Sequence, residues 1–155
     1  MNMLEGLMES FSEAKVVYMI TFNKKGDKHS RPMTNFNENP YETMWFPTYR
    51  NTRKVQDIKE NNKTLIIFPG KKRDEFYEIE GRAEFEDEKV ANEKWQWWYL
   101  YWHPEMKDYF WFSHTDEHKN RIIINVHPIG ARILMKNDLH FVWESYQSIM
   151  PDEDV

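Results

Sequence analysis

Short runs of β-branched and aromatic residues, separated by turn residues, dominate the hydrophobic pattern and predict a chain built mainly of β-strands. A turn at Gly26 and Asp27 joins the first two runs into a hairpin. Gly81, inside a later run, indicates a β-bulge or a close approach of another backbone segment. The expected strands are residues 15–23, 29–37, 41–47, 63–69, 76–86, 121–128 and 129–136, with a further extended segment at 139–146.

Three other segments have apolar residues at helical spacing, and we expect helices at residues 2–13, about 52–61 and 87–102. The second helix turns Val55 and Ile58 toward the interior. The third begins with acidic residues, which helix starts favour, and carries tryptophan and tyrosine on two of its faces. A helix that is apolar on two sides is expected to lie between two surfaces.

The order of these elements indicates the fold class. Few residues lie in helices between the strands, which favours an antiparallel β-barrel with peripheral helices over a doubly wound parallel sheet. The 155 residues match the usual size of one domain and contain no long flexible linker. We therefore expect a single domain over residues 1–155, with its core at about 10–136 and a C-terminal extension at 137–155.

Composition restricts the cellular compartment and the kinds of side-chain chemistry that are expected. The chain is 40% hydrophobic and 16% aromatic, so it can bury a substantial core, and 30% of its residues are charged. It has no cysteine, which excludes disulfides, thiolate metal sites and cysteine nucleophiles and favours a reducing, cytoplasmic setting. The acidic N-terminal segment and the absence of a long apolar run argue against a secretory signal and a membrane span.

Net charge and missing motifs exclude several function classes. At a formal charge of -5, the chain would repel nucleic acid and anionic membranes, so any anion site must be local. The glycine-rich nucleotide loops and the serine hydrolase elbow are absent from the sequence. No catalytic acid or base stands out.

The stretch FPTYRNTRKVQDIKENN, residues 46–62, places Arg50, Arg53 and Lys54 at the start of the second expected helix. A helix start carries unpaired N–H groups and partial positive charge, so it repels cations and attracts phosphate. One interpretation is a solvated basic helix start, and the other is a phosphate site. Hydroxyls of Thr48 and Thr52 could contribute to such a site, and a neighbouring strand could add Arg31.

Other clusters allow two interpretations each. Some of Trp97, Trp98, Tyr101 and Trp111 could form the wall of a pocket, but a role in the core and in a dimer contact fits them equally. His114 and His118 have the spacing of a metal pair on a helix, but a third ligand is not evident and we expect no metal site.

Three segments in a fixed order carry a family resemblance: HSRPMTNFN (29–37), MWFPTYRNTRKVQDIKENNKTLIIFP (44–69) and YEIEGRAEFEDEKVANEKW (77–95). Together they resemble the flavin-binding split-barrel family related to pyridoxamine 5'-phosphate oxidase, and most closely its general stress protein branch. The resemblance covers roughly residues 10 to 130. It implies a six-stranded antiparallel split barrel that forms a homodimer, with FMN held in a groove at the subunit interface.

The resemblance also implies roles for individual residues. In that family the FMN phosphate is held by the arginine of the R-P-M strand and by the hydroxyl, arginine and lysine of the S/T-R-K turn. The matching positions are Arg31, Thr52, Arg53 and Lys54, with Thr48 as a further contact. Next to the flavin ring, mainly through backbone and packing contacts, would lie Pro32, Met33, Phe46 and Pro47.

Two departures from the oxidase sequence limit which properties of that enzyme can be expected of this chain. The oxidase's lysine after the strand arginine is replaced by the sequence TNF, and its C-terminal R-x-H pattern is absent. Oxidation of vitamin B6 is therefore not expected.

The resemblance instead favours an FMN-dependent oxidoreductase of the flavin reductase or stress-response kind, acting on an unidentified small molecule. The alternatives are a deazaflavin-dependent reductase on the same fold and a non-enzymatic flavin store or sensor; haem ranks lower because no histidine is placed as its ligand.

Overall fold

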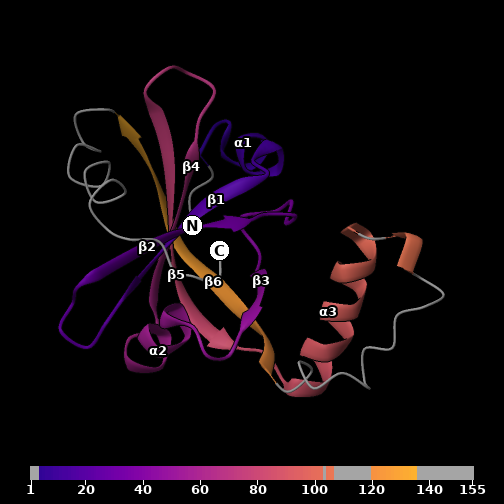
Figure 1. Cartoon of the computed structure of the whole chain (residues 1–155). Helices are drawn as coiled ribbons and strands as arrows, with labels where there is room; N and C mark the ends of the chain where they lie inside the picture. Colours follow the sequence, from indigo (N-terminus) through magenta and orange to yellow (C-terminus); the bar gives the residue numbers. More distant parts are fainter. Residues whose placement is uncertain (1–3, 103, 107–119, 136–155) are drawn as a thin grey trace.

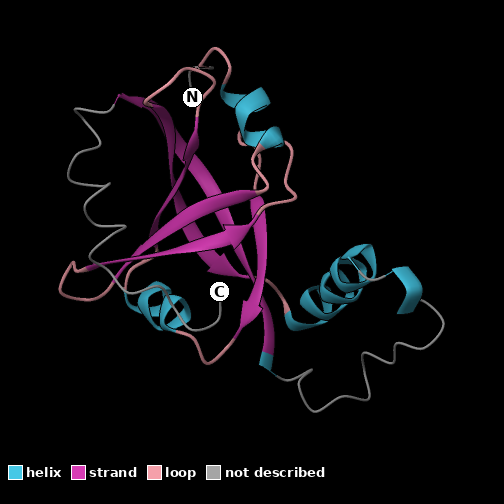
Figure 2. Ribbon diagram, turned by 45° about the horizontal axis from the view of Figure 1, so that its top comes forward, coloured by secondary structure: helices cyan, strands magenta, loops and turns pink. Residues whose placement is uncertain are grey.

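The computed structural model describes residues 4–102, 104–106 and 120–135. Six antiparallel strands form one curled sheet, and three α-helices lie around it (Figures 1 and 2). The strands are β1 (Val16–Phe22), β2 (Lys28–Thr34), β3 (Met44–Tyr49), β4 (Lys63–Pro69), β5 (Glu75–Phe85) and β6 (Arg121–Met135). The helices are α1 (Leu7–Glu13), α2 (Arg53–Glu60) and α3 (Glu88–Trp102), with a short 3-10 turn, η1, at Pro104–Met106.

The strand order is β2-β1-β4-β5-β6-β3, so the sheet ends at β2 on one side and at β3 on the other. The side chain of Asn37, just beyond β2, links these two edges. Its Nδ2 donates a hydrogen bond to the Trp45 carbonyl at 3.0 Å, and the Trp45 N–H donates to Asn37 Oδ1 at 3.0 Å. One amide side chain thus pairs with β3 as a strand would. The six-stranded antiparallel split barrel expected from the sequence is confirmed.

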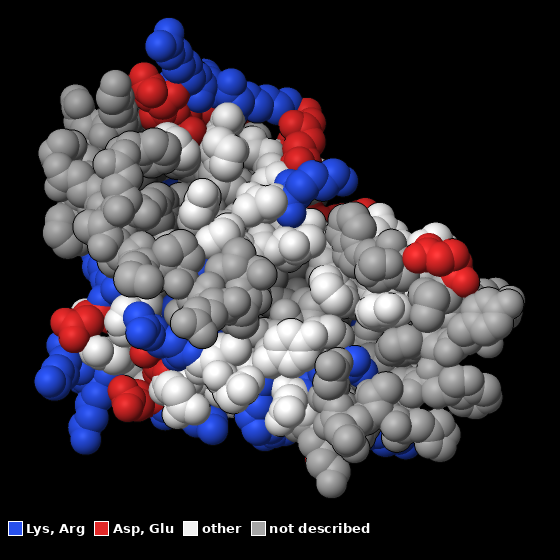
Figure 3. Space-filling model, viewed as in Figure 1, with Lys and Arg blue, Asp and Glu red and all other residues white. Residues whose placement is uncertain are grey.

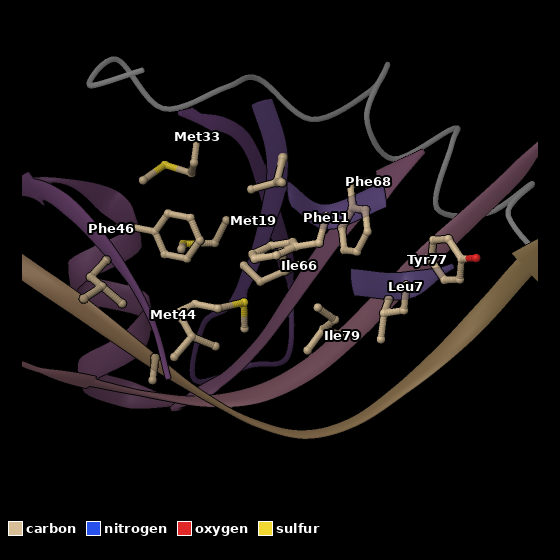
Figure 4. Packing of buried hydrophobic residues seen from close by; sticks show 14 of the residues in the cluster. Leu7, Phe11, Met19, Met33, Met44, Phe46, Ile66, Phe68, Tyr77 and Ile79 are labelled. Atoms are coloured by element: carbon tan, nitrogen blue, oxygen red, sulfur yellow. The ribbon is translucent and has the colours of Figure 1, made fainter. Parts of the chain in front are cut away.

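The main hydrophobic core fills the interior of the curled sheet (Figure 4). Because side chains alternate between the two faces of a strand, paired residues such as Met19, Ile66 and Ile79 all point inward, and all three are fully buried. Helix α1 adds Leu7 and Phe11 to this core from one end of the barrel, and α2 lies at the other end (Figure 1).

One expectation was wrong: residues 121–136 do not form two strands. They form the single strand β6, and the sequence break at Pro128-Ile129-Gly130 is absorbed by a register shift opposite Glu80 and Gly81. The bulge tolerates proline because it relaxes the regular hydrogen bonding. The expected close approach at Gly81 is confirmed, since an added β-carbon would lie 2.5 Å from Val126 Cγ1 and 2.9 Å from the His127 carbonyl oxygen.

Some element boundaries also differ. Strand β3 begins at Met44 because residues 40–43 form a turn, and α1 begins at Leu7. The expected extended segment at 139–146 lies outside the described residues. Within the part of the chain that is described, no helix combines the length and the apolar character needed to cross a membrane.

Candidate phosphate-binding site and its surroundings

The first turn of α2 is basic and lacks a conventional cap. Thr52 is the N-cap residue, but its hydroxyl donates to the Tyr49 carbonyl at 3.0 Å and makes no capping hydrogen bond to the helix. Its first turn contains no acidic residue, although helix starts favour one. We call Thr52, Arg53 and Lys54 the α2 start. This helix start has the N–H groups and the positive charge that an anion requires.

Burial differs among the residues of the α2 start. Arg53 is exposed, Thr52 is buried and Lys54 is fully buried. Thr48, at the end of the preceding strand β3, is buried as well. The strand end and the helix start therefore combine hydroxyl groups with one outward and one inward cation.

Arg31 reaches the underside of α2 from the other edge of the sheet. It pairs with Met19 in the β1–β2 register and points into the barrel, where it is fully buried. Its Nη1 donates to the Thr21 hydroxyl at 2.8 Å and to the Met19 carbonyl at 3.3 Å. Its Nη2 lies 4.0 Å from Oδ2 of Asp57, a residue of α2. The curl of the sheet therefore brings the strand arginine to the helix that begins with Arg53 and Lys54.

Asp57 is central to the contacts under α2, and sequence reasoning missed it. Its Oδ2 accepts a hydrogen bond from the Thr21 hydroxyl at 2.7 Å and lies 2.7 Å from His29 Nδ1. Asp57 is buried, although aspartate side chains are mostly exposed in proteins. A signal was present in the sequence: an aspartate stands beside Ile58 on the face of α2 that Val55 and Ile58 turn inward.

The side chains of the four residues expected beside a flavin ring point to two different faces of their strands. The side chains of Met33 and Phe46 belong to the main hydrophobic core (Figure 4), so only their backbone is available to a ligand. Pro32 and Pro47 point to the opposite face and are partly buried. Contacts of these four residues with a flavin ring, expected from the sequence to be mainly backbone and packing contacts, stay a prediction.

Helix α3 lies beside the barrel, separate from α2 (Figures 1 and 2). Trp95 anchors it: the side chain is 4% exposed, and its Nε1 donates to the Ile122 carbonyl at 2.7 Å. Trp98 is partly buried against Trp95. Trp97 and Tyr101 are 52% and 58% exposed, and their rings stack with centroids 5.5 Å apart.

Aromatic residues of α3 pack against β3 and against the segment that precedes it. The Trp97 ring lies 6.0 Å from the Trp45 ring and 6.0 Å from the Phe36 ring, between centroids. Trp111, His114 and His118 lie outside the described residues. Within the described ranges, no group of three or more histidine, aspartate or glutamate side chains is arranged to hold a metal ion.

A second carboxylate stands at the junction of β5 and α3. Glu86 Oε2 accepts hydrogen bonds from Asn125 Nδ2 at 2.8 Å and from Lys94 Nζ at 3.3 Å. The hydrogen bond from Asn125, followed by those from the Asp87 backbone and Lys94, lowers the pKa of Glu86 below its usual 4.5, although desolvation opposes the shift. The carboxylate thereby joins β6 to the first turns of α3.

The family model described as "Pyridoxamine 5'-phosphate oxidase like" matches residues 2–150 of the sequence. The chain belongs to this family. Its split-barrel fold and the basic α2 start are thus features of a pyridoxamine 5'-phosphate oxidase-like protein. Among proteins with curated descriptions, none matches the sequence.

Solved structures share the fold at low sequence identity. An F420 reductase is 16% identical over 84% of this chain and 98% of its own, with a TM-score of 0.62. General stress protein 26 from Bacillus anthracis is 20% identical over 84% and 96%, with a TM-score of 0.58. A Clostridium acetobutylicum protein related to general stress protein 26 is 17% identical over 82% and 84%, with a TM-score of 0.61.

Proposed function

We propose that this protein is an FMN-binding, homodimeric flavoprotein that acts as a flavin-dependent oxidoreductase. The observation that carries the proposal is the α2 start, a basic first turn that the Thr52 side chain does not cap, in a helix whose Asp57 lies 4.0 Å from the strand arginine Arg31. This combination is unfavourable for an isolated helix but favourable for a bound phosphate.

The residues present fit a flavin phosphate by their chemistry. FMN carries a phosphate with a charge of about −1.5 to −2 at neutral pH and three acceptor oxygens. Arg53 and Lys54 would supply charge, Thr48 and Thr52 hydroxyls, and Arg31 a guanidinium beneath the helix. Asp57, a buried acid of α2, offsets only part of this positive charge. The ring would lie along the backbone of β2 and β3.

A bound flavin supplies the redox chemistry itself, and the protein's residues bind it, orient it and exclude water from it. This division agrees with the lack of an evident catalytic acid or base in the sequence. The absence of cysteine supports a cytoplasmic role.

Several exposed apolar side chains support a second copy of the chain as the partner. Tyr18, Ile129, Trp97 and Tyr101 are each more than a third exposed, although their burial would be favourable. On the face seen in Figure 3, charged side chains gather toward the periphery, and uncharged residues form much of the described centre. A homodimer would cover such surfaces and enclose the cofactor between subunits.

A deazaflavin-dependent reductase is the second candidate, because one structural neighbour is an F420 reductase. A deazaflavin coenzyme carries its own phosphate, so the same α2 start could bind it. A non-enzymatic flavin store or sensor is the third. Competition between FMN and the deazaflavin, and turnover assays with NADH or NADPH and common acceptors, separate these candidates.

The test is an absorbance scan of freshly purified protein, followed by mass spectrometry of any released compound and titration of the apoprotein with FMN. We expect an oxidised flavin spectrum and stoichiometric FMN binding to a dimer. A colourless protein that takes up no added FMN would overturn the proposal. Release of a deazaflavin would favour the second candidate.

A further inference from the structure

A buried polar network connects α2 to strands β1 and β2. It runs from His29 to Asp57, from Asp57 to Thr21 and from Thr21 to Arg31, with distances of 2.7, 2.7 and 2.8 Å between the contacting atoms. We call these four residues the Asp57 network. Asp57, Thr21 and Arg31 are buried, and His29 is mostly buried. Such a network is costly unless its members are held in a defined geometry.

The network joins the two parts of the proposed phosphate site. Arg31 comes from β2, which forms one edge of the sheet, whereas Arg53 and Lys54 belong to α2, which follows the opposite edge, β3. Asp57 is three residues after Lys54, so both lie on the same side of the helix. A carboxylate that holds Thr21 and His29 therefore fixes the first turn of α2 relative to β1 and β2, and with them to Arg31.

We infer that Asp57 is a positioning residue for phosphate recognition: through Thr21 it sets the orientation of Arg31 relative to the α2 start. The inference deepens the proposed function and rests on it. Asp57 itself need not touch the cofactor. Its Oδ2 is engaged by the Thr21 hydroxyl and His29, and Thr21 in turn accepts the hydrogen bond from Arg31.

A purely electrostatic role for Asp57 predicts the opposite result. A carboxylate near a phosphate repels it, so neutralising Asp57 without other change would strengthen FMN binding. If Asp57 positions Arg31, the same substitution disorders the guanidinium and decreases the contribution of the phosphate to FMN affinity. The sign of the effect therefore separates the two roles.

The experiment measures the dissociation constants of FMN and of riboflavin, which lacks the phosphate, for full-length wild-type protein and Asp57→Asn. The ratio of riboflavin to FMN dissociation constants reports the phosphate contribution. We expect this ratio to fall about tenfold in the variant, the effect of losing one charge-assisted hydrogen bond. Riboflavin affinity should stay within about twofold of wild type, because ring contacts are unchanged.

Two further comparisons keep the test independent of folding defects. Thr21→Val removes the hydroxyl between Asp57 and Arg31 while preserving side-chain shape, and should also lower the ratio; Thr21→Ser should restore it. Glu60→Gln is the matched control, since it removes the same charge from an exposed position of α2 and should leave the ratio unchanged. If Asp57→Asn does not fold, the pair of Thr21 variants decides.

The outcomes distinguish this inference from the proposed function. A wild-type ratio, or a higher one, in Asp57→Asn or Thr21→Val would overturn the positioning role while FMN binding by the wild type stands. Wild-type protein that binds neither flavin would overturn the proposed function, and the positioning role with it.

Discussion

Helices α2 and α3 lie on the same barrel, and each is tied to it by a carboxylate, but the two attachments differ in kind. Asp57 of α2 is buried among polar and charged partners from β1 and β2. Glu86, just before α3, is partly exposed and bonds Asn125 of β6 and Lys94 of α3. Under α2 a buried polar network adds to the packing of Val55 and Ile58, whereas α3 is attached largely through aromatic packing.

The two kinds of contact contribute differently: hydrogen bonds mainly set the orientation of groups, and aromatic packing mainly adds stability. Directional hydrogen bonds set the orientation of groups but add little net free energy, since folding exchanges them for bonds to water. Burial of a large ring contributes more free energy and constrains orientation less. The α2 attachment thus suits a site that must hold several side chains in a defined arrangement. The α3 attachment suits a stable platform that leaves Trp97 and Tyr101 exposed.

The largest expected effect is the loss of Trp95. Trp95→Ala removes a side chain that is 4% exposed and packs against Ala91 and Ile123, and it also removes the hydrogen bond to the Ile122 carbonyl. We expect the free energy of unfolding to fall by about 3–5 kcal/mol, the usual cost of deleting a buried tryptophan. Chemical denaturation followed by circular dichroism measures this change.

Trp97→Ala is the matched control on the same helix. Its side chain is about half exposed, so the same truncation should cost less than about 1 kcal/mol. Equal decreases in the free energy of unfolding for the two variants would show that α3 is not anchored through Trp95. The contrast between the attachments of α2 and α3 would then not hold.

The next effect concerns function at α2. Arg53→Ala removes the exposed cation of the α2 start, and FMN affinity should fall about tenfold because a charge-assisted contact to phosphate is lost. The variant should fold and dimerise as the wild type does, because Arg53 is exposed and contributes little to packing. Fluorescence titration with FMN and size-exclusion chromatography measure the two properties.

Arg73→Ala provides the control for net charge. Arg73 is exposed in the turn before β5, so its loss changes the total charge equally but leaves the α2 start intact. Unchanged FMN affinity in Arg53→Ala, or an equal decrease in Arg73→Ala, would mean that the phosphate binds elsewhere or that only overall charge matters.

The sequence predicted the fold class and most elements because strand composition, turn residues and helical spacing are local signals. Gly81 was predicted correctly as a close approach, since the absence of a side chain is visible in the sequence. The single strand β6 was missed because Pro128 and Gly130 usually end a strand, and only the partner β5 shows that a bulge accommodates them.

The candidate site was predictable only in part, for a similar reason. The residues of the α2 start are contiguous in the chain, so the sequence alone could single them out as a candidate, and the resemblance pointed to Arg31. The contacts between Arg31, Thr21 and Asp57 join three elements, and the curl of the sheet alone brings them together. No local pattern encodes such long-range pairs.

The smallest expected effect concerns Glu86, the carboxylate that links α3 to the barrel. The folded-state pKa of Glu86 is lowered, mainly by the hydrogen bond from Asn125, so its ionised form stabilises the fold. This contribution is fully present above the unfolded pKa, near 4.5, and is lost as the pH falls through the lower folded pKa. Glu86→Gln should therefore be less stable than wild type at neutral pH, by less than about 1 kcal/mol.

The difference between Glu86→Gln and wild type should shrink as the pH falls below about 4.5, because the wild-type carboxylate becomes protonated and loses its advantage. Urea denaturation of both proteins at a series of pH values measures it. A difference that stays constant with pH would mean that Glu86 acts through shape and not charge. Glu86 would then tie α3 to the barrel by packing, as Trp95 does, and the polar attachment would be specific to α2.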